Sequence, residues 1–427
     1  MKDSVNAECR ICGNELVEVV NFGKMPIANE FQKIENRTGI SFEMVAVFCI
    51  NCSLFQLREQ PKPEDMFHDH YAFYATTSEF MKRHFKEMVE DHIISKNVSP
   101  EELFVIEIGS NDGILLESLK ENSIKHLGID ASQNVVEYAR SRGLQAEIGF
   151  FGNDLGEKIS EAYGHADYVL AANVICHIPD LLDLGLGVAK VLSEEGEFIF
   201  EEPYALNVLE LTSYDQFYDE HVYIFSLTSV SRVFNQVGLE LIDAIPQETH
   251  GGSMRYVLCH KGKRQPTPRL LKLIEVEEIK GLSAVDTYEK FALNCEKRKE
   301  DLVSLLKQIK SQGKRVGGYA ATSKSTTVLN YCGITQDLIE FISDSTPNKI
   351  GTVAPGSLIP IISHEEMRLN PPDYLVLFAW NHSAEILRKE LPLTQAGLKW
   401  IVFIPDVKIL DPSELKVILE IQKKPVK

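Results

Sequence analysis

The chain has 427 residues, 44% hydrophobic and 25% charged, which predicts two or three soluble domains of ordinary composition. Its formal net charge of −18, with no local cluster of basic residues, argues against a non-specific nucleic-acid binder, which needs a positive face for phosphates. No apolar run reaches membrane-spanning length and the N-terminus lacks the apolar core of a signal peptide, so we expect a cytoplasmic protein without a membrane partner.

Two C-x-x-C pairs lie near the N-terminus: Cys9 with Cys12, and Cys49 with Cys52. Four thiolates form a complete tetrahedral ligand set for zinc and leave no position open for catalysis. A redox pair is the alternative. Because a segment of about 60 residues has few other ways to hold together, we predict a structural zinc in a domain over residues 1–68.

Residues 71–78 (YAFYATTS) precede a helix that we predict over residues 79–94. Tyr71 is a candidate substrate contact, and Tyr74 a candidate for the catalytic group. A capped helix start with aromatic side chains packed on the core explains the same spacing equally well.

Residues 105–113 (VIEIGSNDG) join an apolar, β-branched run to a glycine-containing turn, and an apolar helix pattern follows. This indicates a buried parallel strand and a helix whose first N–H groups face the turn. A second short strand ends in an acid about 20 residues further on, where a carboxylate can accept both hydroxyls of a ribose. The spacing E-x-G-x-x-x-G resembles the first motif of class I S-adenosylmethionine (SAM) methyltransferases. The candidate cofactor contacts are Glu107, Gly109, Asn111, Asp112 and Asp130.

An apolar run after Asp167 predicts the fourth strand of a doubly wound sheet, with residues 173–177 at its carboxyl end. Ligands bind at that edge of open α/β sheets. Asn173 is therefore a candidate on the cofactor side and His177 a candidate functional histidine. The alternative for His177 is a cap on the next helix.

Residues 214–226 alternate aromatic and ionisable side chains too densely for a simple solvated face, and they contain Tyr218, Glu220 and His221. A loop with packed tyrosines and a hydrogen-bonded histidine is the alternative. Further on, paired glycines between His250 and Arg255 suggest a close approach of the backbone to a ligand, although a bend between strands fits as well.

Residues 263–313 are charged and have helical periodicity, which predicts a helical linker. Residues 314–427 alternate strand and helix patterns and predict a second α/β domain with a parallel sheet. Its strands are expected at residues 314–319, 338–343, 373–380 and 398–404. The loop before the helix predicted at residues 325–331 carries hydroxyls and a lysine, so Ser323 and Lys324 are candidates to bind phosphate.

Together these segments resemble the sugar C-methyltransferases that act on nucleotide-linked 4-keto-deoxyhexoses. The resemblance covers nearly the whole chain and rests on the two cysteine pairs and on residues 107–113, 173–177, 218–221, 250–255 and 344–349. It implies SAM in a central domain over residues 69–262 and the nucleotide of the sugar on the C-terminal domain, with Asp344 and Lys349 among the substrate contacts. One departure is Asp219, where relatives more often have histidine.

The resemblance implies removal of a C–H proton next to the 4-keto group, whose oxygen takes up the charge as an enolate; no redox cofactor or catalytic metal is required. We predict His221 as the general base, because the ordinary pKa of histidine lies nearest neutral pH. Tyr218 is the expected donor to the ketone oxygen and shares a face with His221 if the segment is helical. Glu220 would orient His221, and His177 the ketone or a sugar hydroxyl.

We expect methylation at carbon 3, a substrate carried on dTDP or GDP, and a monomeric enzyme; carbon 5 and a cytidine diphosphate sugar are the open alternatives. One rival is a methyltransferase for oxygen or nitrogen on another small acceptor. The other is a catalytically silent protein that binds zinc and a nucleotide sugar. The second α/β domain argues against the first rival, and the presence of both Tyr218 and His221 argues against the second.

Overall fold

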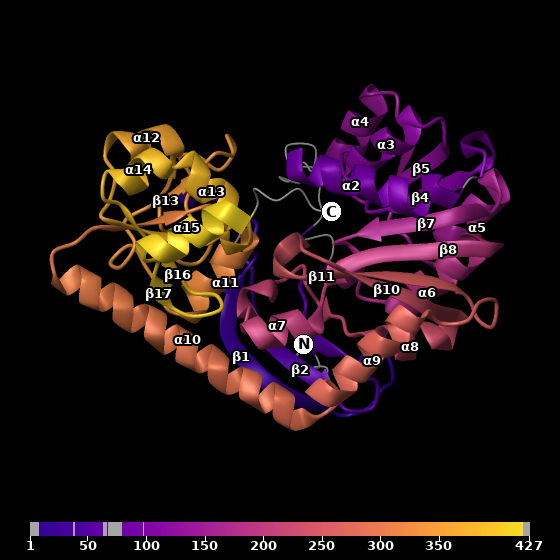
Figure 1. The fold of residues 1–427 in the computed structure, drawn as a ribbon, viewed down its shortest axis with the longest axis horizontal. Coiled ribbons are helices and arrows are strands. Elements are labelled where there is room, and N and C mark those ends of the chain that lie inside the picture. The colour runs from indigo at the N-terminus through magenta and orange to yellow at the C-terminus, as the bar shows by residue number, and fades with distance from the viewer. Residues whose placement is uncertain (1–7, 37–38, 63–65, 67–78, 97, 422–427) are drawn as a thin grey trace.

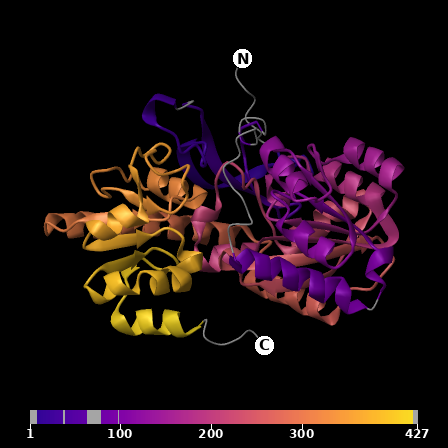
Figure 2. The same cartoon turned by 90° about the horizontal axis from the view of Figure 1, so that it is seen from above.

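The computed structural model describes residues 8–36, 39–62, 66, 79–96 and 98–421. Two α/β lobes lie side by side, and a small N-terminal sheet lies against both (Figures 1 and 2). Phe22 of the small sheet joins the three parts, because its ring lies 5.8 Å from Phe217 of the central lobe and 5.1 Å from Tyr331 of the C-terminal lobe. The three predicted parts are therefore packed as one body.

The N-terminal sheet has the strand order β1-β2-β3-β9 and is antiparallel throughout. Its strands are β1 (Leu16–Pro26), β2 (Ser41–Cys49), β3 (Phe55–Leu57) and β9 (Tyr223–Ile224). Strand β9 comes from the segment that we assigned to the central domain, so the sheet crosses the predicted boundary at residue 68. The Leu57 amide also donates to the Val222 carbonyl (2.7 Å), next to His221.

The central sheet has the order β10-β11-β8-β7-β4-β5-β6 and is parallel except for β11. Its strands are β4 (Phe104–Ile108), β5 (Lys125–Asp130), β6 (Ala146–Ile148), β7 (Ala166–Ala172), β8 (Leu192–Pro203), β10 (Leu239–Gln247) and β11 (Ser253–His260). The chain runs outward from β4 in one direction and from β7 in the other. This reversal places the topological switch point, where open α/β sheets bind ligands, between β4 and β7.

Helices cover both faces of the central sheet. They are α2 (Glu79–His92), α3 (Ile114–Glu121), α4 (Gln133–Ser141), α5 (Asn153–Tyr163), α6 (Leu181–Val191), α7 (Ala205–Leu211) and α8 (Leu227–Phe234). Successive residues of a strand point to opposite faces, and Val105 joins the core under α2, α3 and α4 while Ile106 joins the core over α5 and α6. The continuous apolar run of β4 thus reflects burial on both sides.

The C-terminal lobe has the strand order β14-β13-β12-β15-β16-β17, parallel except for β17. Its strands are β12 (Val316–Tyr319), β13 (Ile342–Asp344), β14 (Ile361–Ser363), β15 (Tyr374–Leu377), β16 (Lys399–Val402) and β17 (Lys408–Ile409). Its helices are α11 (Ser323–Tyr331), α12 (His364–Leu369), α13 (Ser383–Lys389), α14 (Leu391–Gln395) and α15 (Pro412–Ile421). The predicted second α/β fold is confirmed.

Two local predictions in this lobe were wrong. The strand expected at residues 338–343 begins only at Ile342, because the amides of Leu338 and Ile339 donate to the Thr335 carbonyl in a turn (3.0 and 3.2 Å). Helix α11 begins at Ser323, two residues earlier than expected, because Thr322 caps it through the Ser325 amide.

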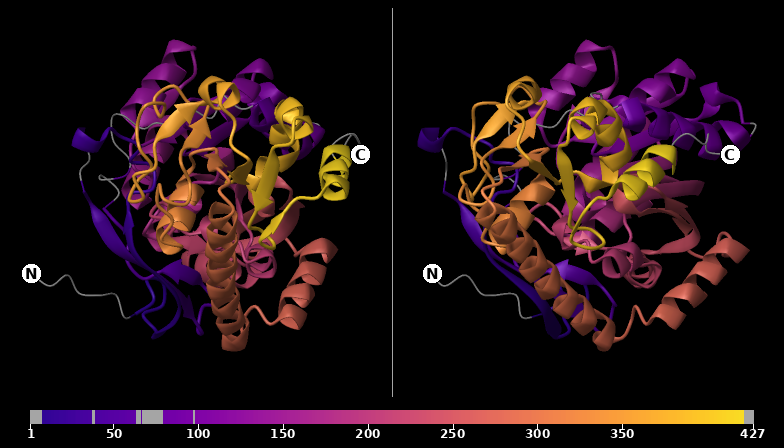
Figure 3. Two further views of the ribbon diagram at one scale, coloured as in Figure 1. Left: turned by 90° about the vertical axis from the view of Figure 1, so that its left-hand side faces the viewer. Right: turned by 60° about the vertical axis from the view of Figure 1, so that its left-hand side comes forward.

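Helices α9 (Pro268–Lys280) and α10 (Val285–Ser311) occupy the predicted linker. Helix α10 is packed against the N-terminal sheet, because it lies along β1 and β2 (Figures 1 and 3). Tyr288 on α10 stacks on Phe48 of β2 with ring centroids 3.8 Å apart. Among the helices of the described residues, none combines the length and the apolar character needed to span a bilayer.

Candidate active site and zinc centre

One cavity of about 1160 Å³ is lined by residues that follow the carboxyl ends of strands in both lobes. Its wall includes Gly109 after β4 and Asn173 after β7 from the central lobe, and residues 321–324 after β12 from the C-terminal lobe. The two topological switch points therefore face a single space, so ligands held by the two lobes can meet there.

The turn after β4 is shaped by close contact with the neighbouring loop. A Cβ on Gly109 would lie 2.5 Å from Cγ2 of Val174, so only glycine fits, and its φ of 70° is left-handed. Asn111 is also left-handed, with φ of 47°, and its amide donates to Oδ2 of Asp130 (2.9 Å). The backbone of this turn is thereby open to the cavity, as a bound cofactor requires.

Two acidic side chains of the cavity wall, Glu107 and Asp130, can accept hydrogen bonds from the hydroxyl and amino groups of SAM. Glu107 is buried, and its Oε2 accepts no hydrogen bond from the described residues. Burial, and then the charges of Asp130 and Asp112, raise the pKa of Glu107 well above its usual range. Asp130 accepts the amides of Asn111 and Ser132 (both 2.9 Å) and lines the cavity with Glu107. Asp112, in contrast, is fully buried and lies off the cavity.

The loop after β7 is held by a buried acid that the sequence analysis overlooked. Oε1 of Glu202 accepts the amides of Val174 and Cys176 (both 3.0 Å), and burial raises the pKa of Glu202 to about 7. These bonds fix the turn that carries Asn173 and, at its end, His177. Both side chains line the cavity, as predicted.

Tyr218 and His221 meet across a tight turn, not along a helix. The His221 amide donates to the Tyr218 carbonyl (2.9 Å), and the phenol oxygen of Tyr218 lies 2.5 Å from Nε2 of His221. The His177 ring lies 5.3 Å from that of His221. Burial is the main cause that lowers the pKa of His221 well below its usual range, and the neighbouring His177, Lys324 and His250 lower it further. His221 is therefore neutral at pH 7.

The N-terminal module reaches this turn through the residues that follow β1. The Ala28 amide donates to Oδ1 of Asp219 (3.0 Å), and Nδ2 of Asn29 donates to Oε1 of Glu220 (2.7 Å). Oδ1 of Asn29 also accepts the hydroxyl of Ser323 (2.9 Å). Asn29 thus links the Tyr218–His221 turn to the C-terminal lobe. The polar end of the motif MPIAN was the available signal.

A buried cation marks the C-terminal wall of the cavity. Nζ of Lys324 has no hydrogen-bond partner among the described residues, and burial lowers the pKa of Lys324. Its nearest counter-charge is Asp215, whose Oδ2 accepts the indole N–H of Trp380 (2.7 Å). Lys349 donates to the Ala321 carbonyl (2.8 Å).

Asp344, another predicted substrate contact, closes the turn after β13. It accepts the amides of Ala321 and Thr346 (both 2.7 Å), and it lines the cavity together with Ser323, Lys324 and Lys349. The structure therefore places all four predicted substrate contacts of this lobe on one wall.

Arg255, which we predicted as a substrate contact, does not reach the cavity. Arg255 is buried in β11, pairs with Glu201 (Nε to Oε1, 2.5 Å) and does not line the cavity. The glycines before it approach side chains of the protein: a Cβ on Gly251 would lie 2.1 Å from the Trp380 ring. His250 does line the cavity.

Tyr71 and Tyr74 lie outside the described residues.

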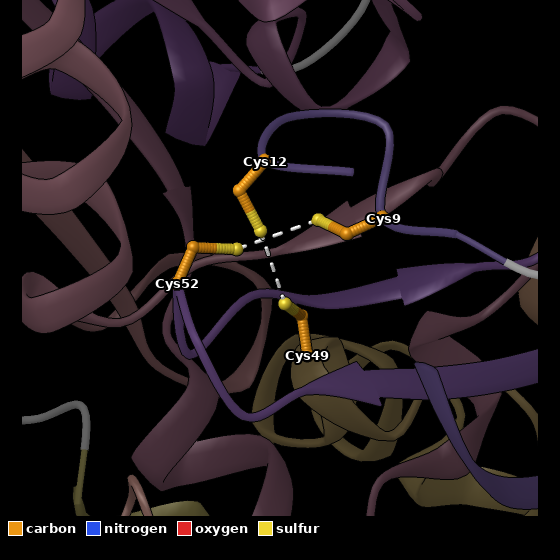
Figure 4. Close-up of side chains that lie close together, drawn as sticks. All are labelled: Cys9, Cys12, Cys49 and Cys52. Atoms are coloured by element: carbon orange, nitrogen blue, oxygen red, sulfur yellow. Dashed lines mark hydrogen bonds between the residues drawn. The ribbon is translucent and has the colours of Figure 1, made fainter. Parts of the chain in front are cut away.

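The four N-terminal cysteines point toward one another (Figure 4). The sulfur atoms of Cys9 and Cys52, and those of Cys12 and Cys49, are 3.4 Å apart, and all four lie within 4.8 Å of one another as free thiols. This spacing fits a tetrahedral Cys₄ zinc, with Zn–S bonds of about 2.3 Å. With four protein ligands the metal is structural.

Comparison with known proteins agrees with this three-part arrangement. Residues 9–67 match the family model of a zinc binding domain, residues 76–244 that of a methyltransferase domain, and residues 248–405 that of a C-methyltransferase C-terminal domain. C-methyltransferase NovU from Streptomyces niveus is 31% identical over 407 residues, which cover 94% of this chain and 96% of NovU. The chain belongs to the SAM-dependent sugar C-methyltransferase family. The predicted enzyme class, SAM cofactor and structural zinc are confirmed, and the two rival interpretations are set aside.

Two solved methyltransferases are also similar to part of this C-methyltransferase. Magnesium protoporphyrin IX methyltransferase ChlM from Synechocystis PCC 6803, solved with bound SAM, is 13% identical with a TM-score of 0.33, over 42% of this chain and 80% of ChlM. A SAM-dependent methyltransferase from Anabaena variabilis ATCC 29413 is 16% identical with a TM-score of 0.34, over 48% and 98% of the two chains.

Asp130→Ala is expected to weaken SAM binding by about 10–100-fold, because hydrogen bonds to a charged group contribute about 1.5–3 kcal/mol. Isothermal titration calorimetry measures the affinity, and circular dichroism checks the fold. Glu137→Ala removes an exposed acid from the neighbouring helix α4 and is the matched control. Unchanged affinity in Asp130→Ala would remove this carboxylate from the cofactor site.

Proposed function

We propose that this C-methyltransferase methylates the carbon next to the ketone, carbon 3, of a 4-keto-deoxyhexose linked to a nucleoside diphosphate such as dTDP or GDP. The observation that carries the proposal is the single cavity in which the SAM-type turn of one lobe and the buried Lys324 of the other face the Tyr218–His221 pair. The product would be a branched deoxysugar, made by a cytoplasmic monomer.

The C-terminal wall supports the diphosphate part of this proposal. A buried ammonium group without a hydrogen-bond partner is costly, and a bound anion that accepts its hydrogen bonds would reduce that cost. Lys324 also lies in the first turn of α11, where the positive end of the helix dipole favours an anion. Lys349 on the same wall provides a second cation. Such a pair is notable in a chain with a net charge of −18.

The Tyr218–His221 pair supports the proton-transfer part. His221 is neutral and can take up the proton next to the ketone, directly or through the oxygen of Tyr218, which lies 2.5 Å away. The phenol can donate to the ketone oxygen as negative charge develops there. His177 lies beside the pair and can hold a sugar hydroxyl or the ketone. Bound SAM supplies an electrophilic methyl group to the resulting carbon nucleophile.

Glu220 has a supporting place in the proposal. It precedes the base in the turn, and Asn29 holds its carboxylate from the N-terminal module. A fixed Glu220 would help to fix the orientation of His221. The same bond ties the position of the base to the module that contains the zinc.

An exchange assay tests the proposed chemistry. The full-length enzyme is incubated in D₂O with each of several nucleotide-linked 4-keto sugars, with S-adenosylhomocysteine in place of SAM. Exchange of one proton next to the ketone is expected by NMR, and with SAM the product should gain one methyl group, located at carbon 3 by carbon-13 NMR. Methyl transfer to oxygen or nitrogen without exchange would overturn the proposal.

Lys324→Ala is expected to weaken binding of the nucleotide sugar by about 10–100-fold, the range for a lost hydrogen bond to a charged group, and to leave SAM binding unchanged. Lys314→Ala removes an exposed lysine of the same lobe, paired with Asp373 outside the cavity, and is the control. Calorimetry with each ligand separately measures both affinities. If the nucleotide sugar binds Lys324→Ala as it binds the wild type, the phosphates lie elsewhere.

A further inference from the structure

Cys176 is a buried thiol for which the proposed reaction has no use, and it lies against the two histidines of the active site. One ligand atom each of Cys176, His177 and His221 lies within 4.8 Å of the other two. Cys176 is fully buried, whereas both histidines line the cavity. A metal ion that enters the cavity can therefore contact both histidines and also bind the adjacent thiol.

The cluster is held in place from two sides. The Cys176 amide donates to Oε1 of Glu202 (3.0 Å), and its carbonyl accepts the Val222 amide (2.9 Å), directly after His221. Both segments that supply ligands are thereby fixed relative to each other. The carboxyl groups of Glu202 and Glu220 lie near the Cys176 thiol, and each favours a cation there when it is ionised.

We propose that Cys176, His177 and His221 form a second metal site, distinct from the Cys₄ centre, that binds Zn²⁺ reversibly. One thiolate and two imidazoles are sulfur and nitrogen ligands of the kinds that zinc binds, and they leave the fourth position of a tetrahedral site open. Zn–S bonds of about 2.3 Å and Zn–N bonds of about 2.0–2.1 Å require the ligand atoms to lie about 3.5 Å apart, so shifts of about 1 Å close the site. Binding replaces the thiol proton of Cys176, which passes to solvent.

Binding at this site would inhibit the enzyme, a consequence that rests on the proposed function of His221. Tyr218 contacts Nε2 of His221, so a metal at Nδ1 leaves that contact intact while a metal at Nε2 replaces it. In both cases the imidazole has no lone pair left to accept a proton. Free Zn²⁺ would thus switch off proton abstraction without affecting the structural metal.

The test uses the full-length protein with its structural zinc in place and Zn²⁺ supplied from a metal buffer. The zinc content of the wild type, measured by elemental analysis after equilibrium dialysis, is expected to rise from one to two ions per chain. Cys176→Ala should bind the second ion at least about tenfold more weakly, since an apolar methyl replaces the thiolate ligand. Cys259→Ala removes another buried thiol, outside the cluster, and should behave as the wild type.

A Co²⁺ spectrum and a second variant, His177→Gln, test the same ligands independently. Co²⁺ added in place of Zn²⁺ should produce a thiolate-to-metal absorption band that Cys176→Ala lacks, and His177→Gln should weaken binding even if Cys176→Ala fails to fold. A wild type that holds only one zinc at saturation, or a Cys176→Ala variant that still binds two, overturns the site. If the second zinc binds through Cys176 but proton exchange continues at full rate, the site stands and the assignment of His221 as the base fails.

Discussion

His221→Asn is expected to slow methyl transfer by about 10²–10⁴-fold, the usual cost of losing a general base. Asparagine keeps a polar side chain of similar size in the turn but cannot accept the proton. Both SAM and the nucleotide sugar should still bind, because most of their proposed contacts are made by other residues of the cavity wall. Methyl transfer is measured by product mass, and loss of the proton next to the ketone by exchange in D₂O.

Tyr218→Phe is the matched variant, since it removes only the hydroxyl that lies 2.5 Å from His221. If His221 takes the proton directly, Tyr218→Phe slows methyl transfer but leaves exchange measurable. If the proton passes through the phenol oxygen, exchange is lost in both variants. Exchange that persists in His221→Asn and vanishes in Tyr218→Phe would reverse the two roles.

The pH profile provides an independent check on His221. Burial lowers its pKa well below the usual 6.5, so the neutral form is present above the lowered pKa and is lost only as the pH falls through it. We therefore expect kcat/KM to stay constant from neutral pH down to below 6.5 and to fall in more acidic solution. An acid limb centred above pH 6.5 would contradict a neutral, buried His221.

Cys52→Ser is expected to cause the largest loss of stability. Structural zinc sites in isolated fingers bind with about 10–16 kcal/mol, far more than an ordinary side-chain truncation costs. The variant should lose the metal by elemental analysis and unfold at a clearly lower temperature. Cys259→Ser replaces another fully buried cysteine with serine and controls for the substitution itself.

The same variant should lose activity, because the zinc centre is connected to the active-site turn. Cys49 and Cys52 flank the turn into β3, and β3 pairs with β9 at Phe55 and Ile224. The bond from the Leu57 amide to the Val222 carbonyl continues this connection to within one residue of His221. A Cys52→Ser protein that holds one zinc, or that lacks zinc and unfolds at the wild-type temperature, would contradict the structural role.

Features that depend on near neighbours in the chain were predictable. The C-x-x-C spacing alone identified four ligands, because each pair sits on a short turn and four thiolates complete a tetrahedral zinc site. The strand, turn and helix around Glu107 were predictable for a similar reason, since burial on both faces leaves a continuous apolar run and the turn needs left-handed residues such as Gly109. The order of these local elements was enough to indicate two α/β lobes.

Contacts between distant parts of the chain were decided only by tertiary packing. The glycines before Arg255 suggested that its side chain contacts a ligand, yet the Arg255 guanidinium pairs with Glu201 on the adjacent strand. Asn29 lies in a stretch to which the sequence analysis assigned no role, yet it joins Glu220 and Ser323 from two different lobes.

The central pair of the active site shows the same division. The sequence by itself determined that Tyr218 and His221 belong together, because they are three positions apart and the chain around them is dense in aromatic and ionisable groups. Only the tertiary structure decided that they meet across a turn, that His221 is buried and neutral, and that Lys324 faces the same cavity. Burial and approach between segments more than 100 residues apart depend on how three modules pack, and no local pattern encodes that geometry.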